Sequence, residues 1–166
     1  MQIICRLIAL SAADAEGILA DPASLPQRVA AASSSSDVYR YWHAIEFLLH
    51  REVPTHAAAE WLSLGRPVPG PDPTLPAHRV LAAAEVVALD AVVRDVPPEA
   101  LAAHYDAATM DAASIYPGTW QAWEEDFDPL GQVLEHYSFL QQFVSRCAAR
   151  GSGVLLQFDL LAEGSV

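Results

Sequence analysis

Apolar residues recur with a helical period between residues 37 and 52. They fall at the i, i+3, i+4 and i+7 spacing of one helix side: Val38, Tyr41, Trp42, Ile45, Leu48 and Leu49. We expect a helix over residues 37–52 that packs this side against a core. A polar stripe lies about 120° around the same helix axis: Tyr39, His43, Glu46 and His50. Asp37, or a serine of the preceding run 33–36, is expected to cap the helix.

Aliphatic runs near both ends of the chain predict strands. Residues 3–10 are rich in β-branched and aliphatic side chains, and residues 154–161 have apolar positions that alternate with a period of two. Ser11 and Asp14 form a capping-box pattern for a helix that ends near residue 20. We expect the two terminal strands to pair with each other.

Helical patterns separated by loops occupy the rest of the chain. The expected helices are 25–32, 57–64, 78–96, 99–104, 106–113 and 129–149. The serines at 33–36 are expected to form a flexible loop. Residues 65–76 are too rich in proline for a regular element, and they form either a lid or a passive connection. These elements predict one α+β domain over residues 1–166, with several helices covering a small antiparallel sheet that includes the N- and C-terminal strands.

The charge balance restricts the classes of partner. Twenty-one acidic residues oppose nine basic ones, all of them arginine, for a net charge of −12. Such a surface repels phosphate backbones and anionic lipid, so we expect neither nucleic acid nor a membrane as partner. It suits a protein partner of basic character, although the acidity can also serve only to keep the protein in solution. The sequence does not fix an oligomeric state.

The two cysteines indicate a reducing compartment. Cys5 and Cys147 lie in apolar patterns without a CxxC or metal-ligand spacing, so we expect free buried thiols and a cytoplasmic protein. The first residues lack a basic leader, and Arg6 interrupts their apolar run, which does not fit a signal peptide. Glu85 and Asp90 break the longest Ala/Val segment, so no membrane-spanning run is expected.

One candidate site combines residues from three parts of the chain. Tyr116 and Trp120 flank the turn formed by Pro117 and Gly118. If this turn packs over the 37–52 helix, the candidate pocket contains His43, Arg79, Tyr116 and Trp120. Arg79 would bind a carboxylate or another anion, His43 would act in acid/base chemistry or hydrogen bonding, and the aromatic rings would form walls. The alternative is that both aromatic residues only pack in the core.

Complete catalytic or cofactor motifs are absent from the sequence. His43, Glu46 and His50 share a helix face, but their spacing is not that of a zinc helix, and we expect neither a metal nor a cofactor. No nucleophile elbow or phosphate-binding loop is present. We therefore expect function through contact with another protein, for example the neutralisation of a basic partner or toxin. The alternative is a small-molecule-binding protein, or an acid/base or metal-assisted enzyme, that uses the His43 face.

Several segments together resemble the YfbM-like family, known as domain of unknown function 1877. They are DPASL, DVYRYWHAIEFLL, HRVLAAAEVVAL and YDAATMDAASIYPGTW, together with the aliphatic strand at each end. The resemblance implies an α+β fold and no established activity, so it assigns no catalytic residue. The chain departs from the family pattern at Glu46, where relatives carry histidine, at Cys5, near a usual glycine, and in its proline-rich loop.

Overall fold

An antiparallel sheet of five strands lies at the centre of the molecule. The computed structural model describes residues 1–32, 34–125 and 127–162. The strand order is β2-β1-β5-β4-β3. The strands are β1 (Gln2–Leu10), β2 (Ser35–Tyr39), β3 (Arg66–Val68), β4 (His78–Leu81) and β5 (Gly153–Leu161).

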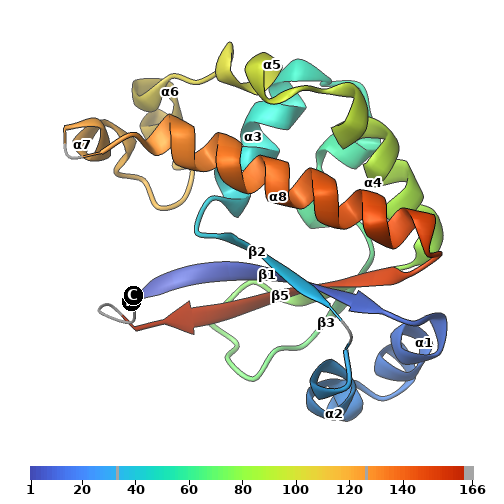
Figure 1. Ribbon diagram of the computed structural model, residues 1–166. Coiled ribbons are helices and arrows are strands. Elements are labelled where there is room, and N and C mark those ends of the chain that lie inside the picture. Colours follow the sequence, from blue (N-terminus) through green and yellow to red (C-terminus); the bar gives the residue numbers. More distant parts are fainter. Residues whose placement is uncertain (33, 126, 163–166) are drawn as a thin grey trace.

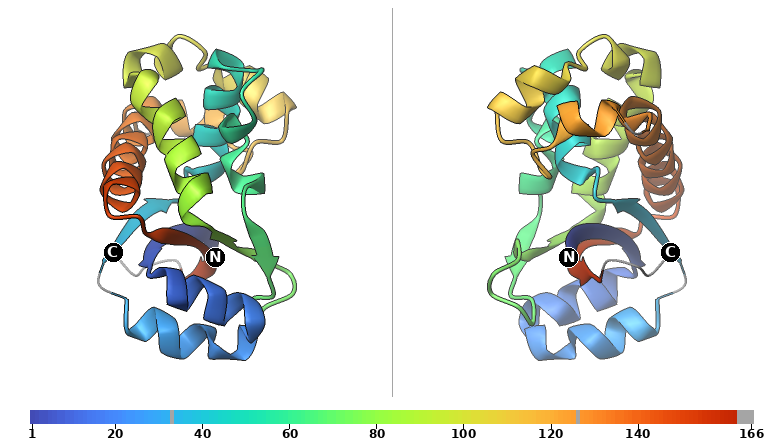
Figure 2. Two further views of the ribbon diagram at one scale, coloured as in Figure 1. Left: turned by 90° about the vertical axis from the view of Figure 1, so that its right-hand side faces the viewer. Right: turned by 90° about the vertical axis from the view of Figure 1, so that its left-hand side faces the viewer.

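Helices cover both faces of this sheet. The first two are α1 (Ala12–Ala20) and α2 (Leu25–Ala30), and the others are α3 (Trp42–Glu52), α4 (Ala83–Asp95), α5 (Pro98–Ala102), α6 (Ala107–Ala112), α7 (Trp120–Glu124) and α8 (Pro129–Ala149). Helices α3 to α8 lie on one side of the sheet, and α1 and α2 lie on the other (Figures 1 and 2). Short 3₁₀ turns connect some of these elements: Pro22–Ser24, Ala57–Ala59 and Trp61–Ser63.

The terminal strands pair as the sequence predicts. The register of β1 against β5 runs from Gln2 opposite Leu161 to Leu10 opposite Gly153. Both strands are central, because β2 continues the sheet beyond β1 and β4 continues it beyond β5. The predicted α+β fold, with a small antiparallel sheet that includes both terminal strands, is therefore confirmed.

Side-chain alternation in the central strands gives the molecule two cores. Leu7 and Phe158 point to the side of α3, α4 and α8, where they join the larger buried cluster. Ile8 and Leu155 point to the opposite side and pack with α1 and the segment around Leu25. Two packed layers thus share one sheet, with apolar residues on both of its faces.

The predicted helix over 37–52 begins later than expected. Residues Ser35–Tyr39 form β2, and α3 starts only at Trp42 after Tyr39 turns the chain with φ +52°. Serine is tolerated in β2 because this is an edge strand, where Ser35 pairs with Ile8. The predicted flexible loop is therefore wrong for Ser35 and Ser36, and Ser33 lies outside the described residues.

The apolar stripe itself is buried throughout, although two of its members precede α3. The predicted capping of α3 by Asp37 or a serine is wrong. Its N-cap is Tyr41, which makes no side-chain capping bond. Asp37 Oδ1 instead accepts the Tyr39 backbone N–H at 2.5 Å, within the turn that leads towards the helix.

Two further boundaries differ from the sequence prediction. Residues His78–Leu81 form β4 rather than the first turn of a helix, and α4 starts at Ala83 after Glu85 accepts the Ala82 backbone N–H at 2.8 Å. A four-residue strand is too short to show its period against the Ala/Val run that follows. The proline-rich segment contains β3, where Pro67 fits because β3 is an edge strand.

Other local predictions are confirmed. The Ser11 hydroxyl accepts the Asp14 N–H at 3.0 Å and starts α1, and Asp106 and Asp128 cap α6 and α8 in the same way. Cys5 and Cys147 are free and buried. Within the described ranges, no helix is long and apolar enough to cross a bilayer.

Candidate functional site

The predicted turn packs against the start of α3. The backbone N–H of Tyr116 donates to Nδ1 of His43 at 3.0 Å. The Tyr116 hydroxyl accepts the backbone N–H of Ile3 at 2.7 Å, which joins the turn to β1. The ring of Trp42 stacks on both His43 and Tyr116, each with a centroid distance of 5.3 Å. These polar atoms are thus paired within the protein and serve to connect its elements.

Arg79 and Trp120 make separate contacts. The guanidinium of Arg79 donates to the backbone carbonyls of Ser63, Leu64 and Gly65 at 2.6–2.9 Å. Trp120 is fully buried, and its indole N–H donates to the Ile115 carbonyl at 2.9 Å. The structure therefore brings His43 and Tyr116 together, whereas Arg79 stabilises a loop and Trp120 packs in the core.

Three members of the predicted polar stripe do share a pocket, which we call the His43 pocket. It measures about 220 Å³ and is lined by His43, Glu46, Phe47, His50, Glu60 and Ile115. Arg79, Tyr116 and Trp120 are not among these lining residues. Across the described residues, no group of three or more His, Cys, Asp and Glu side chains is arranged to hold a metal ion.

Burial shifts the pKa of two residues that line the His43 pocket, Glu46 and His43. Burial raises the pKa of Glu46 to about 7, and the charge of Glu60 adds to this effect. The Leu62 backbone N–H opposes it by donating to the Glu46 carboxylate at 2.6 Å. Burial also lowers the pKa of His43. His50 Nδ1 lies 3.7 Å from a Glu60 carboxylate oxygen, so the pocket holds two carboxyl groups and two imidazoles.

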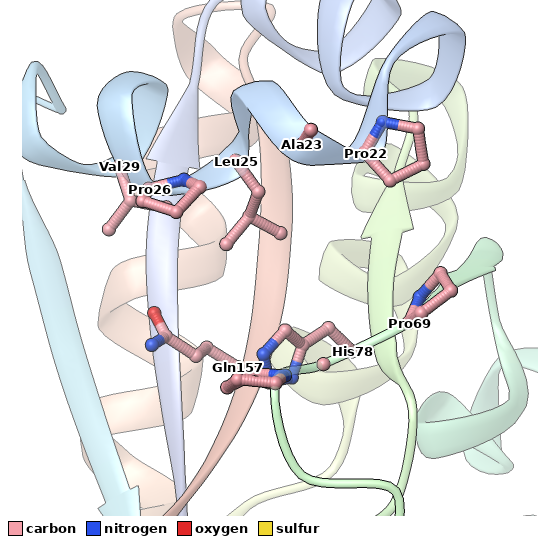
Figure 3. A pocket seen from close by; sticks show the side chains of 10 residues that line it. Pro22, Ala23, Leu25, Pro26, Val29, Pro69, His78 and Gln157 are labelled. Atoms are coloured by element: carbon pink, nitrogen blue, oxygen red, sulfur yellow. The ribbon is translucent and has the colours of Figure 1, made fainter.

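A second pocket, the His78 pocket, lies on the opposite side of the sheet. It measures about 430 Å³ and lies between α2 with the turn before it, the segment 69–71, and strands β4 and β5 (Figure 3). Its lining residues are Pro22, Ala23, Leu25, Pro26, Val29, Pro69, Gly70, Pro71, His78 and Gln157. The walls are aliphatic and proline-rich, and none of the lining side chains is an acid, lysine or arginine.

His78 is held in one orientation and one tautomer. It is 1% exposed, and its Nδ1 accepts the backbone N–H of Phe158 at 3.1 Å. Burial lowers the pKa of His78, so the ring is neutral near pH 7 and carries its proton on Nε2. Nε2 is buried and has no hydrogen-bond partner within the described structure. Gly70 covers this edge of the ring, because a Cβ at Gly70 would lie 3.1 Å from Nε2.

Gln157 stands beside His78 on the same sheet face. Arg79 pairs with Leu156 and Val80 with Leu155, and His78 and Gln157 are the next residues along their strands beyond the Arg79–Leu156 pair. The side-chain amide N–H of Gln157 donates to Asp159 Oδ1 at 3.2 Å. Its carbonyl oxygen Oε1 is buried and lacks a hydrogen-bond partner among the described residues. In Figure 3 both side chains lie across the pocket from Leu25, Pro26 and Val29.

Sequence reasoning missed both residues of this pair. His78 was expected at the start of a helix, and the structure places it at the start of strand β4. Gln157 interrupts an aliphatic strand at a position between Leu155 and Asp159 on one face. A polar residue inside a two-sided buried strand is the signal that marks this position, but its partner becomes visible only from the β4–β5 register.

Comparison with known proteins gives a family and a fold. The family model described as domain of unknown function (DUF1877) matches residues 1–157. A solved structure, that of a protein of unknown function, YfbM, from Escherichia coli, is similar with a TM-score of 0.71 and 12% sequence identity. The alignment covers 94% of this chain and 99% of that one. Among curated proteins none matches. The structural likeness supports the same fold, and it assigns no activity.

Proposed function

The chain belongs to the family described as domain of unknown function (DUF1877), and we propose that it binds a small uncharged molecule in the His78 pocket. The observation that carries the proposal is the pair of buried polar atoms without partners, His78 Nε2 and Gln157 Oε1, on two adjacent residues that line one pocket. Nearly all buried polar groups in folded proteins are hydrogen-bonded, and an unpaired one costs about 1–3 kcal/mol. A ligand that pairs both atoms recovers this free energy.

The shape and lining of the pocket support a small molecule. A volume of about 430 Å³ falls within the range of ligand pockets, which are mostly apolar with a few polar groups that fix orientation. The four proline rings and the aliphatic side chains provide the apolar walls. The absence of charged side chains from the lining favours an uncharged ligand, because a buried ion would lack a counterion there.

The segment 69–71 acts as the lid of this pocket. Gly70 lies against Nε2 of His78, and both this atom and Oε1 of Gln157 are buried in the present conformation. A ligand therefore reaches Nε2 when the segment moves away from the ring. The two unpaired polar atoms destabilise the closed conformation. Hydrogen bonds between these atoms and a ligand therefore favour the open one.

Binding is tested by NMR titration of the ¹⁵N-labelled chain with a panel of uncharged ring compounds: cyclohexanone, phenol and 2-piperidone. We expect the signals of the Phe158 backbone amide and the Gln157 side-chain amide to shift. Ala23→Trp fills the pocket from an exposed position and abolishes these shifts, whereas Ala30→Trp, exposed on α2 and outside the lining, retains them. The proposal is overturned if no compound moves the two signals, or if Ala23→Trp leaves the shifts unchanged.

A second candidate function is contact with a basic protein partner through the His43 pocket. The observation that favours it is the proximity of Glu60 to the half-buried carboxyl of Glu46, because the charge of Glu60 disfavours the charged form of Glu46. An arginine or lysine side chain placed there would relieve this repulsion, and the net charge of −12 would speed the encounter.

The probe for this second candidate is a hexa-arginine peptide. The double variant Glu46→Gln, Glu60→Gln is expected to weaken its binding about tenfold at 0.15 M salt. The control variant Glu135→Gln changes an exposed residue of α8 and leaves Glu46 and Glu60 intact. It is expected to bind the peptide as the wild type does. Equal weakening in the control would show only general attraction to an acidic surface.

A further inference from the structure

The two unpaired atoms of the His78 pocket differ in kind. The Phe158 N–H occupies the lone pair of His78 Nδ1, so Nε2 of the neutral ring presents a hydrogen and is a donor. The Asp159 carboxylate accepts from the amide nitrogen of Gln157, so that nitrogen faces Asp159 and Oε1 faces elsewhere as an acceptor. The pocket therefore offers one donor and one acceptor, each fixed by a neighbour on β5.

The donor and the acceptor belong to neighbouring strands. His78 and Gln157 come directly after the Arg79–Leu156 pair on β4 and β5, and both side chains line the same wall of the pocket (Figure 3). A matching ligand must therefore present an acceptor and a donor along one short edge. We propose that the ligand carries a cis-amide edge, as in a lactam, a cyclic imide or a primary carboxamide. His78 donates to its carbonyl oxygen, and its N–H donates to Gln157. This assignment rests on the proposed binding function.

Other common groups fit this pair less well. A carboxylate only accepts and an ammonium group only donates, so either leaves one of the two atoms unpaired. The N–H and C=O of a trans amide point in opposite directions, so a linear peptide bond reaches one atom alone. A hydroxyl pairs with both through a single oxygen, as a water molecule does, and so gains no selectivity over water. The cis-amide edge supplies two separate hydrogen bonds.

His78 and Gln157 carry the selectivity. One variant can remove the hydrogen-bond acceptor, and another can remove the donor. Gln157→Met keeps the length of the side chain and removes the acceptor. His78→Asn removes the Nε2 donor while its carbonyl oxygen remains available to the Phe158 N–H. Gln132→Met, exposed on α8 and outside the pocket, is the matched control for the glutamine change.

The test measures dissociation constants of the full chain for 2-piperidone, N-methyl-2-piperidone and cyclohexanol by NMR titration. We expect 2-piperidone to bind wild type and Gln132→Met about tenfold more tightly than either other probe. The preference for the N–H over the N-methyl lactam should vanish in Gln157→Met, and His78→Asn should weaken both lactams.

The outcomes distinguish a failure of the cis-amide assignment from a failure of the binding function. Binding of all three probes in the pocket with equal affinity overturns the cis-amide assignment and leaves the binding function standing. Tighter binding of cyclohexanol than of 2-piperidone also overturns it, in favour of a hydroxyl ligand. If no probe moves the Phe158 and Gln157 signals, the cis-amide assignment falls, and the proposed function falls with it when cyclohexanone and phenol also leave both signals unchanged. Retention of the N–H preference in Gln157→Met would show that another acceptor makes the contact.

Discussion

Nδ1 of His43 accepts the backbone N–H of Tyr116, which lies 73 residues further along the chain, at 3.0 Å. This bond gives His43 a structural task, because it connects the start of α3 to the turn that also reaches β1 through the Tyr116 hydroxyl. An imidazole engaged in this way is held by the fold whether or not the adjoining pocket binds anything.

Removal of the His43 acceptor is expected to destabilise the protein. His43→Ala leaves the partly buried Tyr116 N–H unpaired and should lower the free energy of unfolding by about 1–3 kcal/mol in a urea melt. His43→Asn places a carbonyl oxygen near the position of Nδ1 and should recover part of the loss. If both variants unfold within about 0.5 kcal/mol of the wild type, the bond contributes no stability.

Trp42 is expected to be a principal core residue. It is 8% exposed, it stacks on His43 and Tyr116, and its indole N–H donates to the Ile3 carbonyl at 3.2 Å. Trp42→Ala should therefore cost about 3–5 kcal/mol, as a large-to-small change in a core. Val87→Ala on α4, where the side chain is 51% exposed, is the control and should stay within about 0.5 kcal/mol. A loss below about 1 kcal/mol for Trp42→Ala would contradict the burial of this ring.

Glu46 is expected to make stability fall as pH rises from about 4.5 to about 7. Its pKa is raised from 4.5 to about 7 by folding, so the folded state binds this proton more tightly. The contribution is fully present below pH 4.5 and is lost as pH rises through 7. Glu46→Gln keeps an acceptor for Leu62 and should gain about 1–2 kcal/mol over wild type between pH 4 and pH 8, discounted for partial exposure.

Urea melts of the two proteins across this pH range check the effect of Glu46. The difference between variant and wild type isolates it from other titrating groups, including His43, whose lowered pKa acts with the opposite slope. Glu135→Gln, exposed on α8, should show no such pH-dependent gain. A variant-minus-wild-type difference that does not change with pH would contradict the raised pKa of Glu46.

Both thiols are expected to be unreactive in the folded protein. Cys5 is 0% exposed and Cys147 is 3% exposed, and burial raises the pKa of each thiol. Reaction with a chromogenic disulfide should be at least about 100-fold slower in native buffer than in guanidinium chloride. Two equivalents should then react in the unfolded chain. Rapid native labelling of either cysteine would show that its surroundings open locally.

Sequence patterning predicted the layers of this fold because the relevant signals are local. Side-chain period and capping residues gave the terminal strands, α1 and α8, and the apolar stripe of Trp42 is buried as expected. The sequence did not predict the short strands because three to five residues show little period, and β2 and β4 run directly into helical patterns. What fixes them as strands is pairing with β1 and β5, which is not local.

In the candidate sites, too, local spacing was predictable and contacts between distant segments were not. His43, Glu46 and His50 line one pocket, as helical spacing predicts, because three residues of one helix face remain neighbours whatever surrounds them. Arg79 could not be placed in the same way, since its position on β4 directs it to the Ser63, Leu64 and Gly65 carbonyls. His78 and Gln157, which are 79 positions apart, line one pocket only because β4 pairs with β5.

The central position of the two terminal strands affects how the protein folds during its synthesis. β1 leaves the ribosome before β5, its main partner, which lies about 150 residues later in the chain. Until β5 has been synthesised, one edge of β1 is unpaired and its apolar side chains are exposed. This is the kind of surface that chaperones bind. The helices between β1 and β5 can form earlier from contacts that are local in sequence. Both cores are complete only after β5 has paired with β1, because β5 contributes residues to each of them.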